Sequence, residues 1–225
     1  MRKFAYMFVV FGLAVGLGVW LNQSPQTAAL DQEFALPFAA NAQSSDADAG
    51  AAEIIDMVQG AEDAPITVIE YAAFTCPHCA RFHSDVYKLL RKNYIDTGKI
   101  KFIFREVYFH RYGLWASMLA RCSGPERFFA MTDLILGSQK SWSRRDDDDL
   151  AAVEALKKIG RIAGLDEKTI DMCFKDGQKT KLLVEWQGEN RVRDGIQSTP
   201  SFIIDGQPYK NMDYEEFAKI LDEKL

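Results

Sequence analysis

The sequence FTCPHCA at residues 74–80 is the most informative feature of the chain, because it places two cysteines between an apolar, strand-like segment and a helix-like one. Two cysteines separated by two residues at the first turn of a helix lie on one face, within the distance that a disulfide tolerates. We therefore predict a redox-active dithiol. Cys76 is the expected nucleophile, because it lies beside the unpaired amides and the positive dipole end of the helix, and Cys79 is the expected resolving thiol.

The two residues between the cysteines favour the reduced form. Pro77 suits the first helical position because it has no amide to leave unsatisfied, and His78 brings a hydrogen-bond donor or a cation to the Cys76 sulfur. Stabilising a thiolate makes a disulfide easier to reduce. A helix that begins with CPHC is therefore expected to oxidise other thiols.

Other uses of a CxxC motif fit this chain less well. Half a zinc site needs a second pair of ligands, and Cys122 and Cys173 stand alone without metal spacing. Haem attachment needs a histidine directly after the second cysteine, where Ala80 stands. His83 is a conceivable ligand, but its apolar helical neighbours predict a packed or surface histidine. We expect no metal and no organic cofactor.

The N-terminus predicts export. Arg2 and Lys3 precede an uncharged apolar run over residues 4–21, and the next basic residue is Arg81, a distribution that holds the start inside and sends the remainder across a membrane. The run is long for a signal sequence and short for a spanning helix, so residues 1–21 are either a cleaved signal peptide or an anchor. The expected location is the periplasm, with or without a tether to the inner membrane.

Composition divides the rest of the chain. Residues 22–52 are rich in Ala, Gln, Ser and Asp without periodicity, which predicts a flexible tether. Residues 53–225 are long enough for one domain with a substantial core. The net charge is -5 and the sequence has no basic stripe, so we do not expect the protein to bind nucleic acid.

Periodicity within residues 53–225 predicts strands and helices at both ends and helices between them. Strands are predicted over residues 66–71, 100–107, 201–204 and 207–210, the last two joined by an Asp-Gly turn. Helices are predicted over residues 80–94, 112–122, 125–137, 150–164, 166–174, 179–191 and 214–225.

Three segments occur together in this order: DAPITVIEY at residues 63–71, CPHC at 76–79 and STPSF at 198–202. They resemble the DsbA family of thioredoxin-fold disulfide oxidoreductases over residues 53–225. The resemblance implies an α/β thioredoxin fold, a central mixed sheet with flanking helices, interrupted by an all-helical insertion at about residues 112–193. It also implies a cis peptide between Thr199 and Pro200 that faces the dithiol. An ordinary trans turn proline is the alternative.

Glu70 stands six residues before Cys76, where the resembled family has a buried acid. An acid inside an apolar strand costs free energy unless it has a partner or a role. We expect Glu70 either to relay the proton that Cys79 releases or takes up, or to form a structural ion pair, with Arg105 as a candidate partner.

The remaining cysteines, Cys122 and Cys173, lie in the predicted helical block. In an exported protein a leftover pair is expected to form a structural disulfide, and some members of the resembled family carry a second bridge. The alternative is a second catalytic dithiol, although neither cysteine has a helix-end signature. Phe74, Tyr108 and Phe109 are candidates either for a peptide-binding surface or for the core.

The predicted function is that of a periplasmic thiol:disulfide oxidoreductase, which donates the Cys76–Cys79 disulfide to unfolded, newly exported proteins with free cysteines. The resemblance implies reoxidation by a quinone-linked membrane partner of the DsbB type. No patterned N-terminal dimerisation domain is visible, which predicts a monomer. Two alternatives stay open: a disulfide isomerase or reductase, favoured by Thr199 before the proline, and a non-enzymatic chaperone or metal-handling thiol protein.

Overall fold

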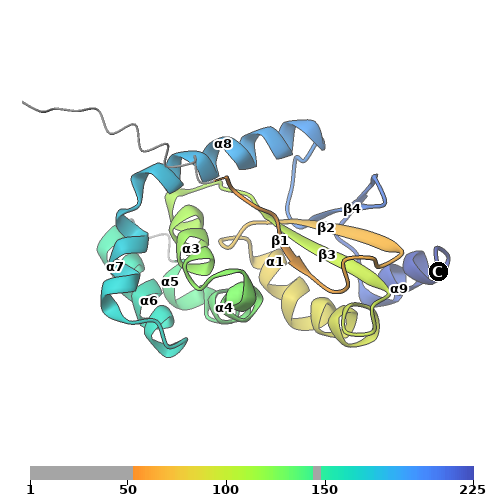
Figure 1. The fold of residues 1–225 in the computed structure, drawn as a ribbon, viewed down its shortest axis with the longest axis horizontal. Coiled ribbons are helices and arrows are strands. Elements are labelled where there is room, and N and C mark those ends of the chain that lie inside the picture. Colours follow the sequence, from red (N-terminus) through yellow and green to blue (C-terminus); the bar gives the residue numbers. More distant parts are fainter. Residues whose placement is uncertain (1–52, 144–147) are drawn as a thin grey trace, which may run out of the picture. The chain divides into compact units, whose positions relative to one another are not determined.

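The computed structural model describes residues 53–143 and 148–225. The predicted signal peptide or anchor (residues 1–21) and the predicted tether (residues 22–52) lie outside the described residues. The described chain forms a mixed sheet flanked by helices, and a block of helices separates the third strand from the fourth (Figure 1). None of the described helices combines the length and the apolarity needed to cross a bilayer.

Within residues 53–143 and 148–225, five strands form one sheet in the order β1-β3-β2-β4-β5. The strands are β1 (Met57–Gln59), β2 (Ile66–Ala72), β3 (Ile100–Glu106), β4 (Ser201–Ile204) and β5 (Gln207–Lys210). β2 and β3 are parallel, and the other three pairs are antiparallel. A parallel pair requires a crossover connection, which the helix that follows the dithiol supplies.

The central strand β2 is buried on both faces. Val68 and Ala72 lie in the main core with Cys79, whereas Tyr71 belongs to a smaller core on the opposite face. Because successive side chains of a strand alternate, Glu70 shares the face of Val68 and Ala72. The sheet therefore directs Glu70 toward the helix that carries the dithiol.

That helix is continuous but not uniform. It comprises α1 (Pro77–Phe82), the π-helical segment η1 (His83–Tyr87), α2 (Lys88–Leu90) and a second π-helical segment η2 (Arg91–Ile95). Phe82 anchors it to the sheet, with its ring centroid 4.7 Å from that of Phe202. π-helical turns are rare in proteins, and those that occur are often found at functional sites. The periodicity of the sequence did not predict them.

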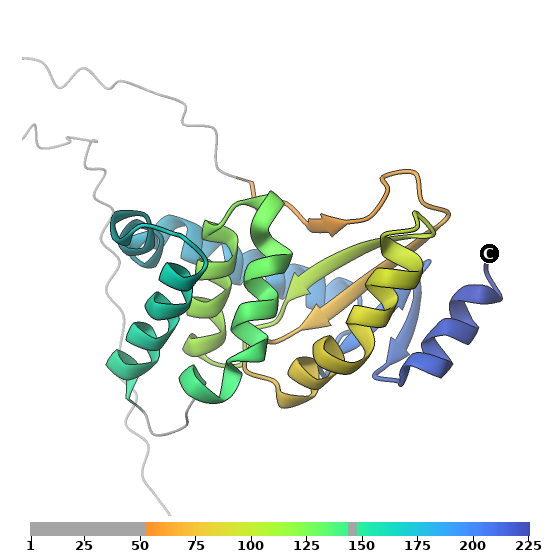
Figure 2. The same cartoon turned by 90° about the horizontal axis from the view of Figure 1, so that it is seen from below.

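Between β3 and β4 the described residues form six helices. They are α3 (Arg111–Cys122), α4 (Pro125–Gly137), α5 (Gln139–Trp142), α6 (Asp149–Ile162), α7 (Glu167–Lys175) and α8 (Gly177–Arg193). Figures 1 and 2 show α3 to α7 gathered beside one end of the sheet, and α8 on the face opposite α1. Close packing of the block depends on Gly160, where a Cβ atom would lie 3.0 Å from side-chain atoms of Leu119 and Ile170.

The chain ends with a hairpin and a helix, as predicted. Asp205 and Gly206 have positive φ angles of 46° and 79°, which the two central residues of a type I′ turn require. α9 (Tyr214–Asp222) begins at the N-cap Asp213 and packs Phe217 against Phe202, with ring centroids 5.1 Å apart. The order of strands and helices confirms the predicted fold class, a thioredoxin fold interrupted by helices.

Candidate active site

The dithiol lies where the chain leaves β2 and begins α1. Cys76 is the N-cap residue of α1, with extended backbone angles, and its amide donates to the Ala73 carbonyl at 2.9 Å. Pro77 occupies the start of the helix, as predicted. Cys76 is partly exposed, and Cys79 is fully buried one turn later. A thiol from solvent can therefore reach Cys76 and not Cys79.

The surroundings of Cys76 favour its ionised form. They lower the pKa of the Cys76 thiol from 9.0 to about 5, mainly through the hydrogen bond from the Cys79 thiol. Partial burial opposes this effect, while Thr199 and the backbone amides of Cys79 and His78 add to it. The two amides belong to the first turn of α1, where backbone donors have no helical acceptor. Near neutral pH, Cys76 is a thiolate.

The His78 side chain contacts a different group from the one predicted. Its Nδ1 atom lies 2.9 Å from Nη2 of Arg81. The backbone amide of His78, rather than its imidazole, acts on the Cys76 sulfur.

Cys79 has the opposite electrostatic character. Burial raises the pKa of the Cys79 thiol well above its ordinary value, and the hydrogen bond to Cys76 and the negative charge of Glu70 raise it further. One sulfur of the motif is therefore a thiolate and the other a thiol. This difference matches the predicted roles of nucleophile and resolving thiol.

The peptide bond between Thr199 and Pro200 is cis. The carbonyl oxygen of Thr199 lies 3.3 Å from Sγ of Cys76, so this loop faces the dithiol. The structure thus brings the sequence-distant Thr199 into direct contact with Cys76.

Glu70 is fully buried, and its partner is His83 rather than Arg105. Oε2 of Glu70 lies 2.9 Å from Nε2 of His83. Arg105 stands opposite Tyr71 in the β2–β3 ladder and pairs with Asp194 at 3.1 Å. The predicted Glu70–Arg105 pair is therefore wrong, because residues 70 and 105 point to opposite faces of the sheet.

His83 is packed, one of the two environments predicted for it, and its neighbours include two carboxylates as well as rings. It is 3% exposed, at the first position of η1, and its Nδ1 lies 3.7 Å from Oδ1 of Asp133 on α4. Burial acts to lower the pKa of His83, but the nearby carboxylates of Glu70 and Asp133 outweigh it and raise the pKa from 6.5 to about 9. His83 is therefore an imidazolium near neutral pH. Among the described residues, no group of three or more His, Cys, Asp or Glu side chains is arranged to hold a metal.

Gln139 is a further residue at the site that sequence reasoning missed. Its Nε2 donates to the carbonyl oxygens of Phe74 at 2.7 Å and of Cys76 at 2.9 Å. Gln139 is buried and begins the short helix α5, so it ties the helical block to the loop that carries the nucleophile. A helix of four residues leaves too little periodicity to predict.

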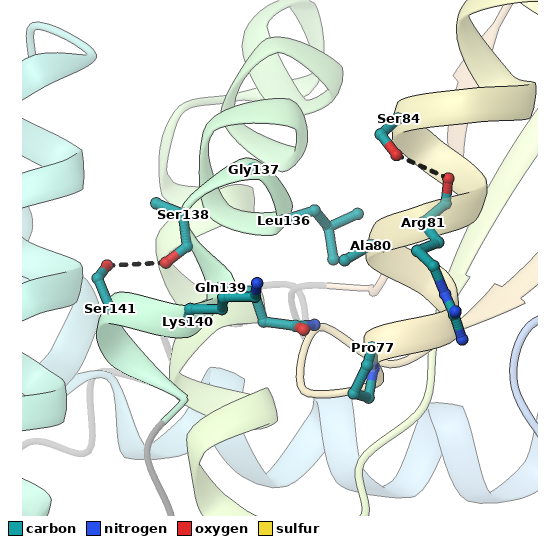
Figure 3. A pocket seen from close by; sticks show the side chains of 10 residues that line it. All are labelled: Pro77, Ala80, Arg81, Ser84, Leu136, Gly137, Ser138, Gln139, Lys140 and Ser141. Atoms are coloured by element: carbon teal, nitrogen blue, oxygen red, sulfur yellow. Dashed lines mark hydrogen bonds between the residues drawn. The ribbon is translucent and has the colours of Figure 1, made fainter.

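A groove of about 720 Å³ lies beside the dithiol, between α1 and the end of α4 with α5. Figure 3 shows Gln139 extending across it toward the loop before Pro77. Arg81 and Lys140 contribute two cations to its lining, and neither makes an ion pair within the described part of the chain. The groove offers polar contacts to a chain that approaches Cys76.

Cys122 and Cys173 form a disulfide, with Cα atoms 6.0 Å apart. The bridge joins the last residue of α3 to α7, within the helical block.

The three aromatic candidates have different environments. Phe74 is a core residue at 1% exposure, and Tyr108 bonds to the Ser117 hydroxyl at 2.8 Å. Phe109 is 46% exposed, with the Arg191 guanidinium 5.8 Å from its ring centroid. Phe109 is therefore the most exposed of the three.

The sheet order, and a CxxC dithiol that begins the first helix after the central strand, are those of a thioredoxin-fold protein. The family model for thioredoxin matches residues 53–223. Two further features agree with the resemblance to the DsbA family. One is the helical block between β3 and β4, and the other is the contact of Thr199 with Cys76.

Known proteins similar to this chain carry names of the same kind. A protein of Rickettsia bellii (strain RML369-C) with the provisional name protein-disulfide oxidoreductase is 33% identical over 171 residues, which are 76% of this chain and 64% of the relative. Disulfide bond formation protein D of Bacillus subtilis (strain 168) is 28% identical over 172 residues, covering 75% of this chain and 76% of that protein. The crystal structure of alpha-DsbA1 from Wolbachia pipientis superposes with a TM-score of 0.67 at 28% identity, over 76% of this chain and 92% of that one.

The chain belongs to the DsbA family of thioredoxin-fold proteins. Its matched part covers 60–64% of the length of the Rickettsia relatives.

Proposed function

We propose that this chain is a periplasmic thiol:disulfide oxidoreductase that donates its Cys76–Cys79 disulfide to newly exported proteins. The observation that carries the proposal is the difference between the two sulfurs of the motif. Cys76 is accessible with a pKa near 5, whereas Cys79 is buried with a raised pKa. A thiol of low pKa is a good leaving group, so Cys76 leaves the mixed disulfide readily, and its stable thiolate favours the reduced form of the protein.

In the proposed reaction, a substrate thiolate attacks the Cys76 sulfur, breaks the Cys76–Cys79 bond and forms a mixed disulfide. Cys79 leaves as a thiolate and takes up one proton. A second substrate thiolate then attacks the substrate sulfur of the mixed disulfide, and Cys76 leaves as a stable thiolate. Two substrate thiolates become one disulfide, and the protein gains two electrons and one proton.

The proposal includes a location, substrates and a partner. The basic start and apolar run of residues 1–21 support export to the periplasm. The substrates are unfolded or partly folded exported proteins with free cysteines, and a quinone-linked membrane protein of the DsbB type reoxidises the dithiol. Family membership supports the partner. Osmotic-shock fractionation of the source bacterium tests the location, and recovery of the chain with the cytoplasmic fraction contradicts it.

Two variants test the chemistry. The oxidised wild-type chain should oxidise a reduced peptide with two cysteines, and Cys76→Ser, which cannot form the motif disulfide, should not. Cys79→Ser, mixed with a peptide that carries a disulfide, should attack it through Cys76, release one peptide thiolate and accumulate mixed disulfides that electrophoresis without reductant detects. If Cys79 proves the faster thiol to alkylate in the reduced protein, the assigned roles are reversed and the proposed mechanism fails.

A third measurement separates an oxidase from an isomerase. We expect a monomer that oxidises reduced, unfolded ribonuclease quickly and reactivates scrambled ribonuclease slowly. Sedimentation velocity measures the assembly, and recovered nuclease activity measures both reactions. A stable dimer or trimer with rapid reactivation of scrambled ribonuclease favours the isomerase instead.

A further inference from the structure

Three titratable side chains form a line from the interior of the domain to its surface. Glu70 of β2 is 0% exposed, His83 of η1 is 3% exposed, and the side chain of Asp133 on α4 is 38% exposed. Glu70 Oε2 lies 2.9 Å from His83 Nε2, and His83 Nδ1 lies 3.7 Å from Asp133 Oδ1. Only the outer member of the line meets bulk water.

The inner end of this line faces the core that holds the buried sulfur. Cys79 lies in that core with Val68 and Ala72, which flank Glu70 on the same face of β2, and the negative charge of Glu70 helps to raise the pKa of the Cys79 thiol. Oε1 of Glu70 is buried without a hydrogen-bond partner among the described residues. One carboxylate oxygen thus holds the imidazole, while the other is free to accept or give a proton.

The outer end has room for water. Nδ1 of His83 also has no hydrogen-bond partner in the described structure, and 3.7 Å to the Asp133 carboxylate exceeds the length of a direct hydrogen bond. A contact of this length between polar atoms is suited to a bridging water. Because Asp133 is partly exposed, such a water exchanges with solvent.

The proposed thiol oxidation needs a proton path of this kind. Cys79 leaves as a thiolate in a fully buried position, where an uncompensated negative charge is costly. The proton that neutralises it cannot come from direct contact with solvent. It must be relayed by groups that lie between Cys79 and the surface.

We infer that Glu70, His83 and Asp133 form the path by which a proton enters and leaves Cys79, with His83 as the relay and Asp133 as the solvent end. This inference rests on the proposed function. During substrate oxidation, Glu70 passes the Nε2 proton of the imidazolium to the Cys79 sulfur. The neutral imidazole keeps its Nδ1 proton, so a half-turn of the ring must bring the vacated nitrogen to the Asp133 end, where it takes up one proton from solvent. No electrons move along the path, and during reoxidation of the dithiol the proton leaves by the reverse route.

The environment of His83 suits a relay. Glu70 faces it from β2 and Asp133 from α4, while within η1 the Tyr87 ring lies 4.5 Å from the imidazole, centroid to centroid. The pKa of Tyr87 is raised by burial, so this neighbour stays neutral. The rings of Phe104 and Phe82 lie 5.7 Å and 5.8 Å from the imidazole, centroid to centroid. The imidazolium is therefore held between two carboxylates and shielded elsewhere by neutral rings.

The test compares three variants of the full chain in the oxidised form. His83→Gln keeps a donor for Glu70 but has no group that exchanges a proton, and Asp133→Asn removes the carboxylate at the solvent end. Asp85→Asn is the matched control, because Asp85 is an exposed acid of the same segment η1 that bonds to Ser84 rather than to His83. The measurement is the single-turnover rate constant for reaction with a reduced two-cysteine peptide, between about pH 5 and pH 10, a range that spans the pKa of His83.

We expect His83→Gln to lower the rate constant by about 10²-fold near neutral pH, the lower end of what a positioned proton donor contributes. Asp133→Asn should react about 10-fold more slowly, and a high concentration of imidazole buffer should restore its rate, because a small acid can replace a partly exposed group. Asp85→Asn should match the wild type. In the reduced form of all three variants, the pKa of Cys76, followed by thiolate absorbance, should be unchanged. A general structural defect would change it.

The outcomes separate the two proposals. If the wild type oxidises the peptide and both path variants react at the wild-type rate at every pH, the path is refuted and the proposed function stands. A slow Asp133→Asn variant that no buffer restores also refutes the path, and this readout remains decisive if His83→Gln does not fold. If the wild type itself does not oxidise the peptide, the proposed function fails and the inference fails with it.

Discussion

The hydrogen bond from Cys79 is the largest influence on the Cys76 thiolate, so removing that donor should raise the pKa of Cys76 from its value of about 5. A hydrogen bond to a charged group contributes about 1.5–3 kcal/mol, and one pKa unit corresponds to about 1.4 kcal/mol. Because Cys76 is partly exposed, solvent screening favours the lower part of that range. Cys79→Ala should therefore raise the pKa of Cys76 to about 6, whereas Cys79→Ser keeps a hydroxyl donor and should leave it near 5.

The assay is the ultraviolet absorbance of the thiolate as a function of pH, in the reduced single variants. Cys122 and Cys173 are held in their disulfide and add no titrating thiol. The same protein in denaturant should titrate near the ordinary value of about 8.5. If the alanine and serine variants titrate together, the Cys79 donor is not the main cause, and the helix amides and Thr199 hold the thiolate by themselves.

The lowered pKa also makes the stability of the reduced form depend on pH. A folded pKa below the unfolded one contributes stability that is fully present above the unfolded pKa and is lost as the pH falls through about 5. Near pH 7 the contribution is about 2.7 kcal/mol before screening and about 2 kcal/mol after it, equivalent to about 40 mV in reduction potential. In urea, the free energy of unfolding of the reduced form should therefore fall relative to that of the oxidised form as the pH falls through about 5, because only the reduced form contains the Cys76 thiolate.

Other parts of the structure can be tested separately. Replacing both Cys122 and Cys173 by serine should lower the free energy of unfolding by up to about 4 kcal/mol, because the bridge spans a sequence separation of 51, while peptide oxidation is retained; urea denaturation measures the loss. Arg121→Met should cost about 3–5 kcal/mol in thermal unfolding, because it leaves the buried Glu106 carboxylate without its two charged hydrogen bonds. The raised pKa of His83 contributes stability that is fully present below 6.5 and is lost as the pH rises through about 9, so the unfolding midpoint of the wild type should fall over that range while His83→Gln lacks this slope.

The fold was predictable where the chain carries strong local signals. The Asp-Gly turn set the bounds of β4 and β5, because both turn residues must adopt positive φ. α4 begins at Pro125, after Gly124 with a φ of 79°, and ends at Gly137, as proline and glycine predict. β1 and α5 were missed because three and four residues are too few for a periodic pattern.

The candidate site was predictable where its chemistry is local, and less so where it depends on packing. The roles of Cys76 and Cys79 follow from their places at the start of one helix. The contact of Thr199 with Cys76 was predicted only from the resemblance to the DsbA family, because no local pattern links residues so far apart in the sequence. Gln139 could not be found, because its two hydrogen bonds exist only when α5 packs against the active-site loop.

His83 is different, because the sequence did contain a signal for it. His83 follows Cys79 by four residues, and residues at this spacing lie on the same face of a helix. Cys79 must be buried if its thiol is to stay protonated, so the residue one turn later is buried as well.

A buried histidine on that face needs a polar partner from the strand beneath it. Ile66, Val68 and Ala72 share a face of β2 with Glu70 and are all apolar, so Glu70 is the one residue of that face that can pair with an imidazole. The same parity excludes Arg105, which lies on the neighbouring strand opposite Tyr71. Combining helix spacing with strand alternation thus predicts the Glu70–His83 pair, which neither pattern predicts alone.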